Sequence, residues 1–509
     1  MKQYEMMELE YQAPAPAGSA VDVDLTATFT SSDGHSQTVS GFYAGNGEYR
    51  VRFYPRFAGQ YHYQVSGVVT DTGDLVCQPA DETATGIIRA AGTHFKTESG
   101  HWFYPFGITV YALAHQSEAV IEETFRSLTA APFNKVRLCI FPKWYEFNHR
   151  EPRWLPFKKD GDQFNVDQPV WAYWDNLDRV IARLNQLGIQ ADLILFHPYD
   201  HWGLAKLNTK QCLTYLNYVI RRFSAYPNIW WSLANEYDLL PFKKEQWLAI
   251  ADYLHQNDPY HHLLSNHHMV IPWDFNNPAT THICVQIKNV DYVSRTIRKF
   301  QKPMMVDECR YEGNINDEWG NISAFEMVNR FWKVITQGAY CTHGETYLSP
   351  DNILWWAAGG KLKGESPARI AFLKKIVESL PGPLEFAGND MNEEKYNQLK
   401  ARAAKHPADF PGFAHYMLAK LDWQQAESLM NSNREFIGKC PNNSAFLYYY
   451  DRHCTARPTI NLPTDGKYQI EVIDSWQMTK KMVVAGVNGQ ITVSLPGKEG
   501  MAILARRIE

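Results

Sequence analysis

Two glutamates directly follow short apolar runs of the chain. Glu236 comes after the run 229–234 and Asn235, and Glu308 comes after Val306 and Asp307. Hydrolysis of an acetal needs one carboxylic acid to protonate the leaving oxygen and one carboxylate to attack or stabilise the anomeric carbon. Either glutamate alone could be a loop-entry carboxylate in a salt bridge. Together they have the residue types that glycoside hydrolysis requires.

The separation of two such carboxyl groups decides the stereochemistry of the reaction. Retaining enzymes hold them about 5–5.5 Å apart, whereas inverting enzymes leave about 6.5–9.5 Å for a water molecule. We predict that the carboxyl groups of Glu236 and Glu308 lie roughly 5–6 Å apart. A separation well beyond about 10 Å would rule out the pair.

These glutamates belong to a region in which apolar runs alternate with helical stretches. The strand-like runs are 103–110, 135–141, 191–196, 229–234, 263–266, 282–287, 303–306 and 339–343. Eight strands with helical connections predict a (β/α)8 barrel, whose active sites lie at the carboxyl ends of the strands. Glu236 after the fourth strand and Glu308 after the seventh should therefore share one mouth. A doubly wound open sheet is the alternative, and the absence of a Gly-rich first turn argues against it.

The chain as a whole is expected to be an α/β protein with β-sandwich domains on both sides of the barrel. Period-two alternation and turn signals indicate an N-terminal β-sandwich over 1–92 and a C-terminal one over 441–509, with the barrel over 93–385. Residues 386–440 are polar and helical in pattern, which indicates an insertion or linker. No Pro/Gly/Ser-rich linker flanks the barrel, so we expect both β-domains to pack against it.

Composition narrows the class of partner. The 509 residues carry a net charge of −5, which argues against nucleic acid and anionic membrane surfaces. Aromatic residues make up 14% of the chain and suit stacking on sugar rings, although most of them should fill the core. Eight scattered cysteines without a CxxC pair and an N-terminus without a signal-peptide pattern predict free thiols in the cytoplasm. We expect an oligosaccharide or small glycoside as partner and no cofactor, and we leave a homo-oligomer open.

The Asn-Glu pair ending strand four and the Glu ending strand seven resemble clan A, the cellulase-like retaining glycoside hydrolases. Within the clan, the chain is most similar to presumed glycosidases with short N-terminal and C-terminal β-domains. The resemblance implies that Glu236 is the acid/base and Glu308 the nucleophile of a double displacement at a β-glycosidic bond. It also implies that Arg137, in the strand-two pattern 133–138, supports the ionised nucleophile and that the Asn235 amide binds the sugar 2-hydroxyl.

The sequence departs from the clan pattern at two strand ends. Strand six carries Gln286 where the clan usually has an aromatic residue near the nucleophile, and we expect Gln286 to replace that contact. Strand eight lacks the usual Trp, so we expect His343 to point into the pocket and Trp355, with its neighbour Trp356, to provide a stacking platform.

Polar and aromatic residues also follow the other strands. Directional hydrogen bonds to hydroxyls and stacking on rings make such a set typical of sugar subsites, although each residue alone could equally be structural. The further candidates for substrate binding are Tyr111, His115, Trp144, His197, Asp200, Trp202, Asn266 and His267.

Two other functions fit parts of this pattern. Histidines at strand ends could bind a metal in a metal-dependent barrel hydrolase, but strand one ends in Thr109-Val-Tyr111 and lacks the usual His-x-His. A catalytically inactive carbohydrate-binding protein would need neither glutamate. The sugar, the linkage and the endo or exo mode are not indicated by the sequence.

Overall fold

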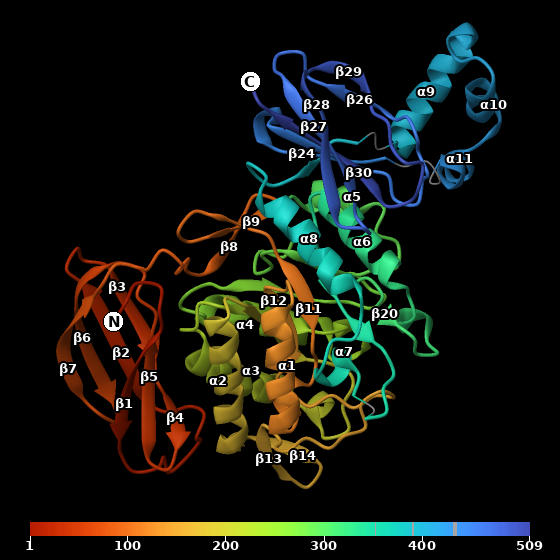
Figure 1. Ribbon diagram of the computed structural model, residues 1–509. Coiled ribbons are helices and arrows are strands. Elements are labelled where there is room, and N and C mark those ends of the chain that lie inside the picture. Colours follow the sequence, from red (N-terminus) through yellow and green to blue (C-terminus); the bar gives the residue numbers. More distant parts are fainter. Residues whose placement is uncertain (352, 389–390, 431–434) are drawn as a thin grey trace. The chain divides into compact units, whose positions relative to one another are not determined.

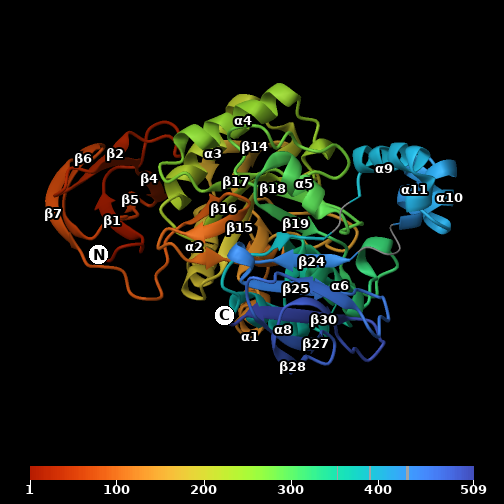
Figure 2. The ribbon, with the colours of Figure 1, turned by 90° about the horizontal axis from the view of Figure 1, so that it is seen from above.

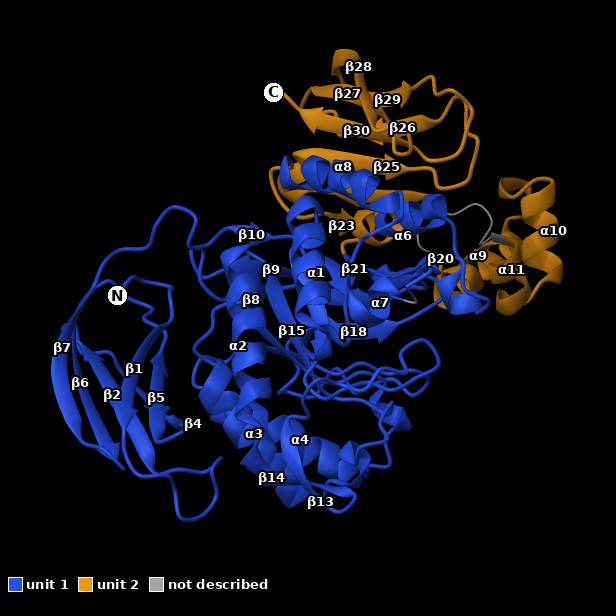
Figure 3. Ribbon diagram, turned by 60° about the horizontal axis from the view of Figure 1, so that its bottom comes forward, with its two compact units in different colours: residues 1–331, 339–379 blue, residues 332–338, 380–509 orange. Residues whose placement is uncertain are grey.

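The computed structural model describes residues 1–509 except 352, 389–390 and 431–434. The chain divides into two compact units, residues 1–331 with 339–379 and residues 332–338 with 380–509 (Figure 3). The first unit contains both glutamates.

Eight parallel strands of the first unit form one sheet that curls into a nearly closed barrel, in the order β17-β16-β15-β12-β11-β21-β19-β18 (Figure 2). The strands are β11 (Phe106–Thr109), β12 (Lys135–Cys139), β15 (Gln190–Phe196), β16 (Ile229–Ala234), β17 (Leu263–Ser265), β18 (Ile283–Gln286), β19 (Met304–Glu308) and β21 (Tyr340–His343). At the seam the Thr281 amide, just before β18, donates to the Leu264 carbonyl at 2.8 Å. The predicted barrel is confirmed.

Amphipathic helices cover the outside of this sheet (Figure 1). They are α1 (Glu118–Ala130), α2 (Trp171–Gln186), α3 (Thr209–Phe223), α4 (Lys244–Asn257), α5 (Val293–Phe300), α6 (Ala324–Thr336) and α8 (Ser366–Glu378). The short α7 (Trp355–Ala358) lies instead at the carboxyl end of β11, where its Trp356 carbonyl accepts the Tyr111 amide. In α2 the apolar stripe Leu177, Val180, Ile181 and Leu184 is buried, whereas Leu187 just after the helix is exposed. A capping box between Asn208 and Gln211 begins α3.

Two details differ from the sequence-based expectation. The connection between β17 and β18, residues 266–282, is a loop and not a helix. Pro272 and Pro278 interrupt any helical run there. The predicted first strand, 103–110, is two elements, because Pro105 separates β10 (Trp102–Phe103) from the barrel strand β11. Strand β10 pairs instead with β9 (His94–Thr97), which also pairs with β8 (Ile88–Ala91).

The β8–β10 sheet packs against the amino-terminal end of the barrel. Phe95 is fully buried, and its ring lies 5.0 Å from that of Trp230 at the start of β16 and 5.5 Å from that of Tyr340 at the start of β21. This end of the barrel is closed by aromatic packing. The opposite end, where the strands finish, is the end at which the active sites of such barrels lie.

The N-terminal β-sandwich consists of the antiparallel sheets β1-β5-β4 and β3-β2-β6-β7. Its strands are β1 (Met7–Gln12), β2 (Leu25–Ser31), β3 (Ser36–Ser40), β4 (Phe42–Gly45), β5 (Glu48–Phe53), β6 (Gly59–Gly67) and β7 (Asp71–Cys77). Phe29 and Phe53 stack between the sheets with ring centroids 3.9 Å apart. Arg52 of β5 reaches the barrel helices, where it pairs with Asp178 of α2 at 2.6 Å.

Four short strands belong to loops of the first unit. They are β13 (Phe157–Asp160) and β14 (Gln163–Pro169), which form a hairpin, and β20 (Glu312–Gly313) and β22 (Glu345–Thr346), which pair in parallel. The β20–β22 pair extends the ends of strands seven and eight beyond the barrel.

The second unit contains a six-stranded sheet, β23-β24-β25-β30-β27-β28, and a two-stranded sheet, β26-β29. Its elements are β23 (Glu385–Phe386), α9 (Glu393–Lys405), α10 (Phe413–Lys420), α11 (Trp423–Met430), β24 (Phe436–Lys439), β25 (Ala445–Tyr449), β26 (Thr459–Leu462), β27 (Tyr468–Asp474), β28 (Thr479–Val487), β29 (Gly489–Thr492) and β30 (Met501–Arg507). The segment 386–440 is thus helical over α9–α11, which share their own core, but it also supplies β24. Residues 389–390 and 431–434 of that segment lie outside the described residues.

Candidate active site

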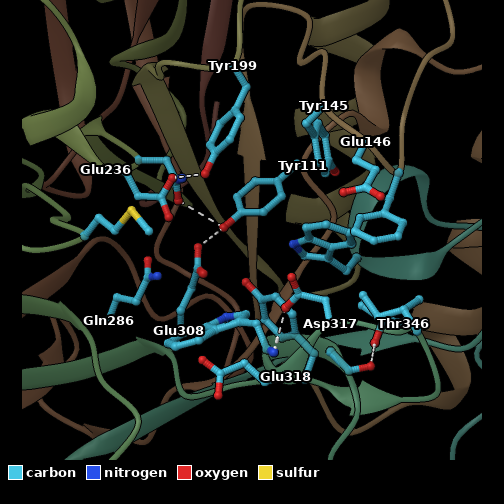
Figure 4. Close-up of a pocket in the computed structure, with 18 of the residues that line it drawn as sticks. Tyr111, Tyr145, Glu146, Tyr199, Glu236, Gln286, Glu308, Asp317, Glu318 and Thr346 are labelled. Atoms are coloured by element: carbon cyan, nitrogen blue, oxygen red, sulfur yellow. Dashed lines mark hydrogen bonds between the residues drawn. The ribbon is translucent and has the colours of Figure 1, made fainter.

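A cavity of about 790 Å³ opens at the carboxyl ends of the barrel strands (Figure 4). Both Glu236 and Glu308 line it, together with Tyr111, Asn235 and Gln286 from the predicted set. The remaining lining residues are Lys143, Tyr145, Glu146, Phe147, Tyr199, Met269, Val270, Ile287, Lys288, Asn289, Tyr311, Ile315, Asp317, Glu318, Trp319, Gly320, Thr346 and Trp356.

Glu236 is buried at the end of β16 in an uncommon backbone conformation. Its φ of 52° lies in the left-handed region, which residues with a side chain rarely occupy and which is enriched at functional sites. Its amide N–H donates to His267 Nδ1 at 3.2 Å, and the Tyr199 hydroxyl donates to its carboxylate. Burial and the nearby charge of Glu308 raise the pKa of Glu236 to about 7, against the opposing effects of Lys143, Tyr199 and Gln286.

Glu308 ends β19 in surroundings of the opposite kind. The Tyr111 hydroxyl donates to its carboxylate and also lies 2.9 Å from the Asn235 side-chain oxygen. Arg137 Nη1 and His267 Nε2 each lie 3.9 Å from Glu308 Oε1. Burial lowers the pKa of His267 well below its ordinary value, so this imidazole is neutral. The predicted proximity of Arg137 to Glu308 is present in the structure.

Buried ion pairs inside the barrel hold Arg137 in place. Lys135 Nζ lies 2.6 Å from Asp192 and 2.8 Å from Asp307, and Arg137 Nε lies 3.5 Å from Asp192. The neighbouring cations Lys135 and Arg137 outweigh the effect of burial and hold the pKa of Asp307 well below its usual range. Two cations balance two aspartates here, and Glu308 lies at the open end of the cluster.

Lys143 contacts three tyrosine rings at the wall of the cavity. Its ammonium nitrogen lies 3.4 Å from the ring centroid of Tyr111, 4.3 Å from that of Tyr199 and 4.8 Å from that of Tyr145. Burial lowers the pKa of Lys143, with Cys139, Glu236 and Glu308 acting in the opposite direction and Arg137 adding to the effect of burial. One cation therefore touches both tyrosines whose hydroxyls bind the two carboxylates.

Several polar atoms in the cavity wall are free to bind a ligand. Within the described part of the chain, the buried atoms of the cavity wall without a hydrogen-bond partner include Asn235 Nδ2, Gln286 Oε1, Tyr145 Oη and Trp319 Nε1. Buried polar groups are normally satisfied, and donors and acceptors of this kind match sugar hydroxyls. Trp356, whose ring lies 4.9 Å from that of Tyr145, adds an aromatic wall.

The remaining predicted binding residues do not line the cavity, and four of them support strand ends or aromatic packing. Asn266 accepts the Ala234 amide at 3.1 Å, and His267 lies behind Glu236 and Glu308. His115 stacks on Tyr173 at 5.1 Å. His197 is buried with Nε2 3.2 Å from the Phe141 carbonyl, and burial lowers its pKa to about 3.

The other five predicted binding residues brace loops or the packing behind the cavity. Asp200 accepts amides of its own loop, including that of Trp202 at 2.9 Å. The Trp202 indole N–H donates to the Glu151 carboxylate, and the ring centroids of Trp144 and Trp202 lie 6.1 Å apart. His343 lies 3.0 Å from Ser366 Oγ, and Trp355 is fully buried.

Sequence reasoning selected the right loops, but it chose the wrong neighbour in the first loop and only one of its two tryptophans lines the cavity in the second. In the loop after β12, Lys143 and Tyr145 line the cavity, whereas the intervening Trp144 was the candidate. After β21, Trp356 lines the cavity and Trp355 fills the core. Tyr311 and Trp319 lie beyond β19 in loops whose direction no sequence pattern indicated.

Other chemistries find little support in the described residues. No group of three or more His, Cys, Asp or Glu side chains among them is arranged to hold a metal ion. The carboxylates of Glu312 and Glu345, which would be the next catalytic candidates after Asp307, accept backbone amides of residues 363–366.

Among the helices described, none is long and apolar enough to cross a membrane.

Family models match three parts of the chain. The model for the Apiosidase-like catalytic domain matches residues 89–382, more than half of the chain. Two domains of unknown function, DUF5060 and DUF5605, match residues 1–67 and 434–506. No curated protein is significantly similar to the chain in sequence.

Solved structures with a similar fold are glycoside hydrolases by description. A presumed glycoside hydrolase from Bacteroides vulgatus is 29% identical, with a TM-score of 0.85, over 100% of this chain and 99% of its own. A family 5 glycoside hydrolase from the same organism is 15% identical, with a TM-score of 0.59, over 83% of this chain and 94% of its own. The second likeness shows the fold alone.

Proposed function

Since the chain belongs to the Apiosidase-like family and is a glycoside hydrolase, we propose that it cleaves a β-glycosidic bond with retention of configuration. In this proposal Glu308 is the nucleophile and Glu236 is the general acid/base. The observation that carries the proposal is the contrast between the two carboxyl groups in one cavity. Two carboxylates with different roles need different surroundings, and these two have different charged and hydrogen-bonding neighbours.

The surroundings of Glu308 suit a nucleophile. Arg137 at 3.9 Å and the hydrogen bond from Tyr111 favour its ionised form. In the first step the Glu308 carboxylate forms a bond to the anomeric carbon as the bond from that carbon to the leaving oxygen breaks. The free Asn235 amide nitrogen beside Glu308 is suited to donate to the sugar 2-hydroxyl, a contact that strengthens in the transition state.

The surroundings of Glu236 suit an acid that later becomes a base. With a pKa of about 7, raised by burial and by Glu308, its carboxyl group can be protonated near neutral pH. It gives this proton to the leaving oxygen. Once the covalent intermediate has neutralised Glu308, the ionised Glu236 takes a proton from water, and that water releases the sugar.

A panel of aryl glycosides tests this function. The panel should include an aryl β-apiofuranoside, because the family takes its name from an apiosidase. Proton NMR should show that the sugar is first released with the anomeric configuration of the substrate. The Glu308→Gln variant should not hydrolyse any glycoside that the unsubstituted enzyme hydrolyses. Release of the inverted sugar would refute the double displacement, and full activity of Glu308→Gln would refute the assignment of the nucleophile.

A further inference from the structure

The loop after the fifth barrel strand exposes three consecutive apolar side chains. Met269, Val270 and Ile271 are 45%, 70% and 61% exposed. Single apolar residues at a surface are ordinary, but a contiguous apolar segment beside a cavity commonly marks a binding surface. We call residues 269–271 the apolar lip.

The apolar lip is fastened to the segment that carries Glu236. The carboxylate of Asp238, two residues after Glu236, accepts the backbone N–H groups of Met269, Val270 and Ile271 at 2.8, 2.7 and 2.8 Å. Burial opposes the charge of Asp238, but these three donors hold its pKa below the ordinary value. The lip is therefore held in a defined position by charge-assisted hydrogen bonds.

The lip also forms part of the cavity wall on the side of Glu236. Met269 and Val270 line the cavity, as does the apolar Ile287 at the end of β18. Charged residues gather elsewhere in the wall, where Glu146, Asp317 and the ion pair of Lys288 with Glu318 are found. The cavity thus combines an apolar segment with a strongly polar remainder.

An apolar leaving group fits this wall better than a second sugar does. The side chains of the lip offer no donor and only the weak acceptor of the Met269 sulfur, and Asp238 already occupies all three of its backbone N–H groups. A sugar placed there would lose hydrogen bonds to water without replacement, which is costly. Alkyl or aromatic carbon would instead be removed from water together with the exposed apolar side chains.

We infer that the apolar lip binds the aglycone, and that the substrates are glycosides of an apolar alcohol or phenol. This inference rests on the proposed function, because it places the leaving group beside Glu236, the residue that protonates its oxygen.

Binding of free phenols tests the lip without any knowledge of the sugar. A fully buried methylene group strengthens binding roughly fourfold, and on a partly open lip we expect about twofold for each carbon. By calorimetry, 4-butylphenol, which has four more carbons, should therefore bind about 16-fold more tightly than phenol. The double variant Met269→Ser, Val270→Ser should reduce this ratio to about two. Val76→Ser, at a similarly exposed valine of the N-terminal β-sandwich, is the matched control and should leave the ratio unchanged.

Kinetics separate the failure of this inference from failure of the proposed function. In a series of 4-alkylphenyl glycosides the acidity of the leaving phenol hardly changes, so a rise of kcat/KM with chain length reports binding of the alkyl group. Hydrolysis without such a rise, or an equal rise in the lip variant, would overturn the inference and leave the glycosidase intact. No hydrolysis of any glycoside would refute the proposed function, while the phenol titration would still test the lip.

Discussion

Glu236 and Glu308 line the same cavity, but the structure surrounds them differently. Glu308 adjoins a buried cluster in which Lys135 and Arg137 balance two aspartates, and a tyrosine hydroxyl donates to it. Glu236 is buried on a strained turn, and its pKa is raised. The difference shows how the place of a carboxyl group in the barrel can suit it to one chemical role. The buried ion cluster favours a negative charge on Glu308, which adjoins it, but not on a group outside the cluster.

The largest effect should come from replacing Glu308. Glu308→Ala removes the nucleophile, so activity should fall by several orders of magnitude on every substrate, whatever its leaving group. Added azide should rescue activated aryl glycosides and give a glycosyl azide of inverted configuration, because the anion attacks from the vacated face. NMR of the azide checks the result. An azide of retained configuration would reverse the roles of the two glutamates.

Replacing Glu236 should affect substrates unequally. Glu236→Ala should lower kcat/KM by about 10²–10⁴ for glycosides with poor leaving groups, which need protonation. Aryl glycosides with acidic phenols should lose far less in this first step. Rescue by azide should yield the glycosyl azide of retained configuration. Equal losses across a series of leaving groups would contradict the role of Glu236 as the acid.

Removing the tyrosine hydroxyl beside Glu308 tests the support of the nucleophile. A hydrogen bond to a charged group contributes about 1.5–3 kcal/mol, so Tyr111→Phe should lower kcat by roughly 10–100-fold. Tyr145→Phe is the matched control, because within the described residues the Tyr145 hydroxyl has no partner and its loss should act on KM. Equal losses of kcat in the two variants would contradict a specific role of the Tyr111 hydroxyl at Glu308.

The smallest change in rate, but the most specific, concerns the pH profile. Because Glu236 must be protonated, kcat/KM should fall as pH rises above its pKa of about 7. Lys143 lowers the pKa of Glu236, so Lys143→Met should raise this pKa further and move the alkaline limb of the profile to higher pH. The groups around Lys143 are Cys139, Arg137, the two glutamates and the three tyrosines.

The pH experiment has a matched control in the same cavity. Lys288 is exposed and paired with Glu318, so Lys288→Met should leave the alkaline limb nearly unchanged. Lys143→Arg keeps the charge and should preserve the profile of the unsubstituted enzyme. A Lys143→Met profile that coincides with that of the unsubstituted enzyme would show that the cation does not influence the carboxyl groups.

Strand periodicity was enough to predict the barrel and the strands that carry the two glutamates. Apolar runs must become inner strands, and parallel strands present their carboxyl ends at one mouth. A helical connection was predicted for residues 266–282, which form a loop, although the two prolines of this segment indicated against a helix. Pro105, which divides the predicted first strand, was an equally visible signal.

The sequence by itself determined the barrel, the flanking β-domains and the arrival of Glu236 and Glu308 at one edge, because side-chain periodicity and strand order are local properties of the chain. Only the tertiary structure decided which loop residues face the cavity. Lys143 and Trp356 line it while Trp144 and Trp355 do not. The direction of a loop side chain depends on partners far apart in sequence, as when Asp238 holds residues 269–271 through their amides. Such contacts form only when the barrel brings separate strand ends together.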